Sequence, residues 1–185
     1  MEDTPVATRW RKRLRRYEIA NQPRFLTFSC YHRLPLFSND AIKSRFVDHL
    51  GAAKARDRFH LIAWVLMPDH LHLIIVPNHA IASMDQVLTR LKGDFAREVI
   101  GRWKELDARI LNRITHANGR RRFWQHGGGY DRNIRDEDEL WEKIDYIHAN
   151  PVRRGLVSAI IDWPWSSARW YEGDRAGSLI EIDSV

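Results

Sequence analysis

The sequence predicts an α+β fold in which helices cover one face of an antiparallel sheet. Segments 59–67 and 70–76 are rich in strand-forming residues, and only Pro68 and Asp69 separate them, so the short link forces an antiparallel hairpin. Amphipathic helical patterns flank this hairpin and give the order β-α-β-β-α-(β)-α. With 185 residues, of which 44% are hydrophobic, the chain is long enough and apolar enough to form one domain with a buried core.

The part of the chain before the hairpin contributes one strand and one helix. Residues 25–31 are dominated by β-formers and predict the first strand. Residues 38–40, a Ser-Asn-Asp run, can cap the start of a helix. Apolar residues then recur every three to four positions, as the buried face of a helix requires. They are Ile42, Phe46, Leu50 and Ala53.

The part after the hairpin begins with a longer helix. Ser83 and Gln86 can form a capping box at its start. Residues 112–129 break the helical pattern, and we expect a long loop there with a short edge strand around residues 123–125. The apolar stripe of the longer helix is Met84, Val87, Leu88, Leu91, Phe95, Val99 and Trp103.

A last helix and a tryptophan-rich segment complete the predicted domain. Asp136 and Glu139 can form a second capping box, and Pro151 is expected to end this helix because the residue before a proline avoids the helical region. Residues 162–171 are expected to pack back onto the sheet, although their tryptophans could instead stack on bases. The expected organisation is a basic arm over 1–24, one domain over 25–171 and a C-terminal tail over 172–185.

The charge balance of the chain is basic. Thirty Lys and Arg against 24 Asp and Glu give a net charge of +6, which suits a polyanionic partner. The arm holds a dense basic cluster, for which we favour contact with nucleic acid over the alternative of a solubilising tail. The cluster comprises Arg9, Arg11, Lys12, Arg13, Arg15 and Arg16.

Composition also bears on the compartment. Cys30 is the only cysteine, which excludes an internal disulfide and a Cys-rich zinc module and is consistent with a reducing cytoplasm. Because it lies in a predicted strand, a role in the core is favoured over one as a nucleophile. Residues 1–10 hold no apolar core of signal-peptide length, and the longest apolar run, 61–67, is shorter than the ~20 residues of a membrane helix. We therefore expect a soluble cytoplasmic protein without a membrane partner.

Two histidines in the second hairpin strand form the first candidate site. Side chains alternate along a strand, so His70 and His72 point to the same face, about two rises of ~3.3 Å apart. Two imidazoles at this spacing can share a metal ion if that face is open. The alternative is a pair of surface histidines without function. The opposite, core-facing side of the strand carries Leu71, Leu73 and Ile75.

A tyrosine on the last predicted helix is the second candidate. Tyr146 lies away from the core stripe, and Asn150 lies one turn beyond it on the same side. This arrangement fits a nucleophile beside a metal ligand. The alternative is an ordinary half-buried tyrosine with its hydroxyl in water. The core stripe itself is Leu140, Ile144 and Ile147.

Several blocks of the sequence resemble a known family. Residues 64–74, WVLMPDHLHLI, resemble the H-U-H motif of the single-tyrosine transposases. Residues 145–157, DYIHANPVRRGLV, are similar to the tyrosine helix and exit of one branch, the REP-associated tyrosine transposases, which are IS200-like. Further matches to that branch are residues 123–125, 130–132, 134–135 and 163–167.

The resemblance, which extends over roughly residues 22–171, implies the ferredoxin-like HUH endonuclease fold. It implies cleavage and rejoining of single-stranded DNA at hairpin-forming repeats. His70, His72 and Asn150 would hold Mn²⁺ or Mg²⁺, and Tyr146 would attack the phosphate to give a 5′-phosphotyrosine intermediate. Tyr130 is a rival nucleophile because it is expected in a flexible loop, but Tyr146 is preferred because its helix would hold it opposite the metal.

The DNA implied by the resemblance would be held by cations along its backbone and by stacking on unpaired bases. We favour a monomer, with a dimer as the alternative because insertion-sequence relatives pair. The candidate DNA-binding residues are Arg11, Lys12, Arg13, Arg15, Arg16, Lys92, Arg120, Arg121, Arg122, Arg153 and Arg154.

Two other functions stay open at this point. A non-catalytic hairpin-DNA-binding protein would bind in a salt-sensitive way and cleave nothing. A metallohydrolase would use His70 and His72 to activate water and would form no covalent adduct, but the sequence offers no acidic third ligand at a persuasive spacing. It also contains no G-x-S-x-G, H-E-x-x-H or phosphate-loop motif.

Overall fold

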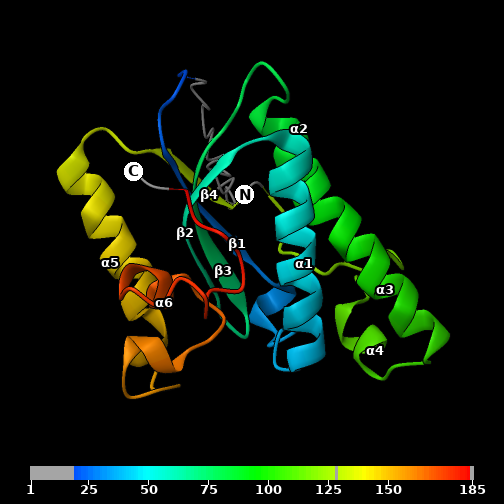
Figure 1. Cartoon of the computed structure of the whole chain (residues 1–185). Helices are drawn as coiled ribbons and strands as arrows, with labels where there is room; N and C mark the ends of the chain where they lie inside the picture. Colours follow the sequence, from blue (N-terminus) through cyan, green and yellow to red (C-terminus); the bar gives the residue numbers. More distant parts are fainter. Residues whose placement is uncertain (1–18, 128, 184–185) are drawn as a thin grey trace, which may run out of the picture.

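The core of the fold is a sheet of antiparallel strands (Figure 1). The computed structural model describes residues 19–127 and 129–183. The strands are β1 (Arg24–Ser29), β2 (His60–Leu66), β3 (His70–Val76) and β4 (Tyr130–Asn133). Their order across the sheet is β2-β3-β1-β4, and every neighbouring pair is antiparallel. This is the split βαβ order of a ferredoxin-like sheet, so the predicted α+β class and the β2–β3 hairpin are confirmed.

The helices follow the predicted order along the chain. They are α1 (Asp40–Asp57), α2 (Met84–Leu88), the π-helical turn η2 (Thr89–Asp94), α3 (Phe95–Glu105), α4 (Ile110–Ile114), α5 (Glu137–Arg153) and α6 (Ala168–Tyr171), with 3₁₀ turns η1 (Tyr31–Arg33) and η3 (Ile160–Asp162). The predicted capping box is present: the Ser83 hydroxyl accepts a hydrogen bond from the Gln86 amide, and the Gln86 side chain accepts one from the Ser83 amide. The predicted single helix over 83–103 is interrupted by η2.

One face of the sheet packs against α1, α2 and α3 and holds the larger core (Figure 1). Leu71, Leu73 and Ile75 point into this core, as strand alternation predicts, and Leu26 and Phe28 of β1 join them. The helices contribute Phe46, Val47, Leu50, Met84, Val87, Leu91, Phe95 and Val99.

The other face is covered by α5, which corrects the prediction of helices on one face only (Figure 1). Ile144 and Ile147 of α5 pack there against Val65 and Ile74. The reason is visible in β2, where every residue from Leu61 to Leu66 is buried. A strand buried on both sides needs a cover on both sides.

The edge strand lies later in the chain than predicted. Around residues 123–125 only an isolated bridge joins Trp124 to Cys30, whereas β4 begins at Tyr130 and pairs with β1. Gly129 permits this pairing: a Cβ on it would lie 2.2 Å from the Thr27 carbonyl oxygen, and its φ is +75°. Tyr130 is therefore fixed in a strand, not carried by a loop.

The last helix runs past Pro151 to Arg153, so the prediction that the proline ends it is wrong by two residues. Proline removes only one helical donor. The lost bond is the one to the Ile147 carbonyl, and backbone bonding continues beyond it, since the Arg154 amide donates to the Asn150 carbonyl and the Leu156 amide donates to the Pro151 carbonyl.

The tryptophan-rich segment packs onto the β2 edge, as predicted. The Leu66 amide donates to the Trp165 carbonyl, and the Ser167 amide donates to the Trp64 carbonyl. The Trp163 indole donates to the Leu66 carbonyl, which makes it a packing residue in this structure. Within the expected tail, Ile180 and Ile182 are buried in the larger core. No helix in the described ranges has the length and apolarity needed to cross a membrane.

Candidate active site

The two histidines of β3 lie side by side on the α5 face. The ring centroids of His70 and His72 are 4.9 Å apart, so the prediction that both point to one face is confirmed. The face is not open, however, because each histidine is only 5% exposed. His72 stacks on Phe25 of β1 at 5.4 Å between ring centroids, and the Tyr146 ring lies edge-on at 5.3 Å.

Each imidazole is oriented through its Nδ1 atom. His70 Nδ1 lies 2.6 Å from Asp69 Oδ1, and His72 Nδ1 lies 2.7 Å from Thr27 Oγ1. An ionised carboxylate only accepts hydrogen bonds, so His70 carries a hydrogen on Nδ1, and in the neutral form of this imidazole Nε2 is the atom with the lone pair. Among the described residues, neither Nε2 atom has a hydrogen-bond partner. A carboxylate behind a metal-binding imidazole is a common second layer of metal sites.

The charges of this cluster favour a neutral His72 and an ionised Asp69. Burial and the neighbouring His70 and Arg33 lower the pKa of His72 to about 3, so its imidazole is neutral at physiological pH. For Asp69, burial acts to raise the pKa, but the hydrogen bond with His70 and the charges of His70, Arg154 and Arg33 outweigh it and leave the pKa below its usual value. Neutral imidazole is the form that binds a metal.

Helix α5 and the residue that follows it carry three candidate side chains along one side. Tyr146 contacts His72 at one end, and the Arg154 guanidinium, just past the helix, lies 3.8 Å from Asp69 at the other. Asn150 is four residues from each and 7% exposed. Because residues four apart are neighbours on a helix, Asn150 lies between these two contacts along α5.

The angular position of α5 is set by a buried hydrogen-bond network. His148 Nε2 lies 2.9 Å from Ser167 Oγ, which in turn accepts a hydrogen bond from the Trp64 amide of β2. Burial lowers the pKa of His148 to about 4, so this link is made by a neutral imidazole. The network turns His148 toward β2 and leaves Tyr146 toward the β3 histidines.

These donors fit a divalent ion of mixed nitrogen and oxygen preference. Two imidazole Nε2 atoms and one amide oxygen are ligands that Mn²⁺ accepts, with waters completing its shell. Within the described ranges no group of three or more His, Cys, Asp and Glu side chains could hold a metal. A third protein ligand would have to come from another residue type, and the amide of Asn150, one turn beyond Tyr146, is the candidate from the sequence.

Comparison with known proteins identifies the family of the chain. The family model for the IS200-like transposases matches residues 24–149. This range begins at the first residue of β1, ends on α5 one residue before Asn150, and includes both histidines and Tyr146. The chain belongs to the IS200-like transposase family.

Individual relatives of this IS200-like transposase carry more specific names. It is 34% identical over 134 residues to the REP-associated tyrosine transposase of Escherichia coli K12; the match covers 69% of the chain but only 64% of that relative's length. It is 27% identical over 161 residues to a Haemophilus influenzae protein named a putative REP-associated tyrosine transposase, covering 80% of the chain and 85% of the relative. A solved REP-associated tyrosine transposase bound to a REP hairpin superposes with a TM-score of 0.64 at 25% identity, covering 95% and 92% of the two chains.

The rival tyrosine of this IS200-like transposase lies further from the histidines. Tyr130 of β4 pairs with Thr27 of β1, which in turn pairs with His72 of β3, so two strand spacings of about 4.8 Å separate Tyr130 from His72. Its ring contacts Phe25 at 5.9 Å between centroids and is 43% exposed. The position suits contact with substrate better than attack at the histidines.

Sequence reasoning assigned no role to three residues of the site. Asp69 and Thr27 orient the imidazoles, and Phe25 supports both His72 and Tyr146. Only Asp69 had a visible sign, because an acidic residue directly precedes the first histidine. Thr27 and Phe25 lie on another strand, and their proximity to β3 depends on strand register.

The predicted DNA-binding residues of the transposase divide into three groups. Arg153 lies over the Tyr146 ring at 5.3 Å and Arg154 near Asp69, so both border the site. Lys92 and 120–122 gather elsewhere, around a hollow beside α3. The arm residues lie outside the described part of the chain: Arg11, Lys12, Arg13, Arg15 and Arg16.

Proposed function

We propose that this protein cuts and rejoins single-stranded DNA at hairpin-forming, REP-like repeats through a covalent bond to Tyr146. The observation that carries the proposal is the contact between the Tyr146 ring and the His72 imidazole, with Asn150 one turn further on. This brings a nucleophile beside two metal-binding side chains. The names of the relatives, and the hairpin in the solved relative, support the substrate.

The proposed reaction is a transesterification at phosphorus. The Tyr146 oxygen forms a bond to phosphorus, the bond from phosphorus to the 3′ oxygen breaks, the phenolic proton goes to solvent, and the released 3′ oxygen takes up a proton. The 5′ phosphate stays on the tyrosine, so the reverse attack by the 3′-hydroxyl restores the strand without ATP. Because Tyr146 is 37% exposed, its hydroxyl is open to a substrate.

We propose that His70, His72 and Asn150 hold Mn²⁺ or Mg²⁺ during this reaction. When bound, such an ion supplies charge that stabilises the non-bridging phosphate oxygens. The protein's own contribution is to orient both imidazoles, through Asp69 and Thr27, and to hold Tyr146 in contact with His72.

The direct test is capture of the covalent intermediate. A labelled DNA hairpin with a single-stranded extension is mixed with the protein and Mn²⁺, then denatured and separated by electrophoresis. We expect a labelled band at the protein's mass that requires the divalent ion. Binding without this band would favour the non-catalytic DNA-binding alternative, and cleavage without it would favour a metallohydrolase.

The Asp69–His70 hydrogen bond predicts a partial loss of Mn²⁺ affinity when the carboxylate is removed. Asp69→Asn removes the carboxylate that holds the His70 proton on Nδ1, and we expect the affinity for Mn²⁺ to fall about 10- to 100-fold. The measurement is the Mn²⁺ concentration needed for half-maximal adduct formation, which should rise while the yield at saturating Mn²⁺ recovers. Asp48→Asn, on the exposed side of α1, is the control. An unchanged Mn²⁺ requirement in Asp69→Asn would contradict the assigned role.

A further inference from the structure

The α3 side of the molecule carries a second basic surface, on the opposite face of the sheet from Tyr146. It is a hollow of about 570 Å³ between η2–α3 and residues 119–124, and we name it the basic hollow. No acidic residue is among the described residues that line it. Its cationic residues are Lys92, Arg97, Lys104, Arg120, Arg121 and Arg122.

The backbone around the basic hollow is open and held in place. Gly93, Gly101 and Gly119 line it, and a Cβ on any of them would meet no atom within 4 Å, so a ligand can approach the main chain. The Trp124 indole donates a 2.9 Å hydrogen bond to the Lys92 carbonyl and thereby ties residues 119–124 to η2. Helical segments of the π type often occur at functional sites.

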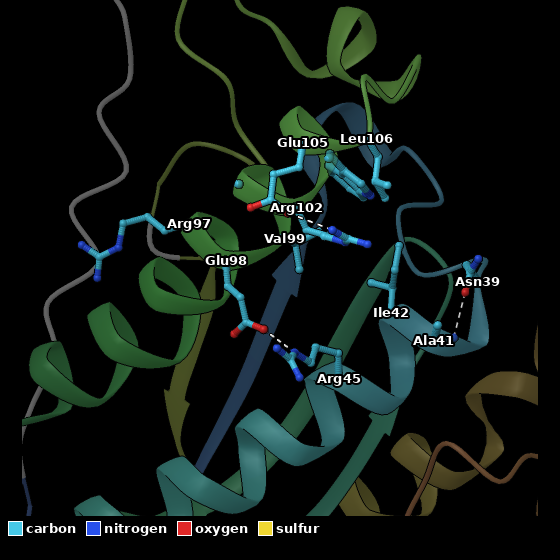
Figure 2. A pocket seen from close by; sticks show the side chains of 12 residues that line it. Asn39, Ala41, Ile42, Arg45, Arg97, Glu98, Val99, Arg102, Glu105 and Leu106 are labelled. Carbon is cyan, nitrogen blue, oxygen red and sulfur yellow. Dashed lines mark hydrogen bonds and ion pairs between the residues drawn. The ribbon is translucent and has the colours of Figure 1, made fainter.

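The opposite side of α3 differs in its charges. There, α1 and α3 border an apolar groove, and Figure 2 shows two ion pairs among the charged residues that line it. Arg45 pairs with Glu98 from the neighbouring helix, and Arg102 pairs with Glu105. Arg97 lines both hollows, extends away from these pairs in the same view and pairs with Asp94. Basic side chains concentrate on the other side of α3, where no acidic residue is among the described lining residues.

We infer that the basic hollow binds the sugar–phosphate backbone of a base-paired DNA stem. This inference rests on the proposed function and adds a binding surface to it. Sites for single strands combine cations with exposed aromatic rings on which bases stack. In the basic hollow the two aromatic residues, Phe123 and Trp124, are 1% and 8% exposed, so it offers charge without a stacking surface. Backbone contact to a duplex requires only the charge.

The exposed aromatic rings lie instead on the histidine face. Tyr130 and Tyr146 are 43% and 37% exposed, and both contact Phe25 beside His72. The two faces thus suit two parts of one substrate, with unpaired nucleotides at the tyrosines and paired nucleotides at the basic hollow.

One DNA hairpin can reach both surfaces. Six residues lead from Trp124 at the basic hollow to Tyr130 at the histidine face, so the two are at most about 20 Å apart. That span equals roughly six rises of 3.4 Å along a DNA strand. Lys92 connects the two regions, since its ammonium group donates to the Gly127 carbonyl and lies over the Phe28 ring.

The test compares two double variants that lose the same charge from α3 and its surroundings. Lys104→Gln with Arg121→Gln changes the basic hollow, and Arg45→Gln with Arg102→Gln changes the paired side. Fluorescence anisotropy measures the affinity of each for a DNA hairpin with an eight-base-pair stem and a single-stranded extension, and for the extension alone, over a series of KCl concentrations. Thermal unfolding checks that both variants fold.

We expect the affinity of the basic-hollow variant for the hairpin to fall about 10-fold or more. The slope of log affinity against log KCl concentration should become shallower by about 1.8, or 0.9 for each lost phosphate contact. That variant's affinity for the extension alone, and the paired-side variant's affinity for the hairpin, should change less than twofold. Equal losses in both variants, or equal losses on both DNAs, would overturn the inference. Adduct formation by the unsubstituted protein is measured separately, because it tests the proposed function. If the adduct forms but the basic-hollow variant shows no selective loss of stem binding, only the present inference is refuted.

Discussion

Replacing Tyr146 by phenylalanine is expected to abolish the covalent DNA adduct, with a loss of about 10³-fold or more in strand cleavage. The change removes only the phenolic oxygen. The ring contacts with Phe25 and His72 and the Arg153 guanidinium over the ring can all be retained. We therefore expect hairpin affinity and thermal stability to stay close to those of the unsubstituted protein.

Tyr130→Phe is the matched control for Tyr146→Phe. It removes a hydroxyl from the other exposed tyrosine of the same face, two strands away from His72. The adduct should persist in Tyr130→Phe and disappear in Tyr146→Phe. The reverse pattern would assign the nucleophile to Tyr130, and an adduct in both variants would remove each from that role.

Substitution of His72 is expected to have the second-largest effect. His72→Ala should weaken Mn²⁺ binding about 100-fold or more, beyond the 10- to 100-fold typical of residues behind the ligands, because it removes a metal-binding atom itself. The loss can be measured without DNA, from the electron paramagnetic resonance signal of free Mn²⁺. Adduct formation should fall in parallel and recover little at high Mn²⁺.

Two further variants separate metal binding from folding at this position. His72→Ala leaves the partly buried Thr27 hydroxyl without its partner, and loss of this hydrogen bond is expected to cost about 0.5–1.5 kcal/mol of folding stability. The double variant Thr27→Val with His72→Ala removes both polar groups and should recover stability but not Mn²⁺ binding. His60→Ala, an exposed histidine at the start of β2, should bind Mn²⁺ normally. Normal Mn²⁺ affinity in His72→Ala would contradict the metal site.

Much of the local structure follows from short-range patterns in the chain. The two-residue link at Pro68 and Asp69 is enough to predict the β2–β3 hairpin, because no other connection closes in so few residues. Strand alternation places His70 and His72 on one face, and the four-residue helical period places Tyr146 and Asn150 on one side of α5. The Ser83–Gln86 capping box is local for the same reason.

Three predictions from the sequence were wrong: the end of α5, the position of the edge strand, and the number of sheet faces covered by helices. Pro151 remains inside α5, where it removes a single backbone bond while Ile144 and Ile147 of the same helix are buried against the sheet. The edge strand begins at Tyr130 because Gly129 allows a close approach to Thr27, which lies about a hundred residues earlier in the chain. Helix α5 covers the histidine face because β2 needs an apolar partner on both sides.

The sequence by itself determined the sheet-and-helix class, the hairpin, and the residue types and spacings of the histidine, tyrosine and asparagine motifs. It did so because these depend on neighbours within a few positions, where backbone geometry alone relates one side chain to the next. Only the tertiary structure decided that Tyr146 meets His72, that Asp69 and Thr27 orient the imidazoles, and that Lys92 joins Arg120 in one basic hollow. Those contacts join residues on different elements, so their proximity depends on strand register and on how each helix packs against the sheet.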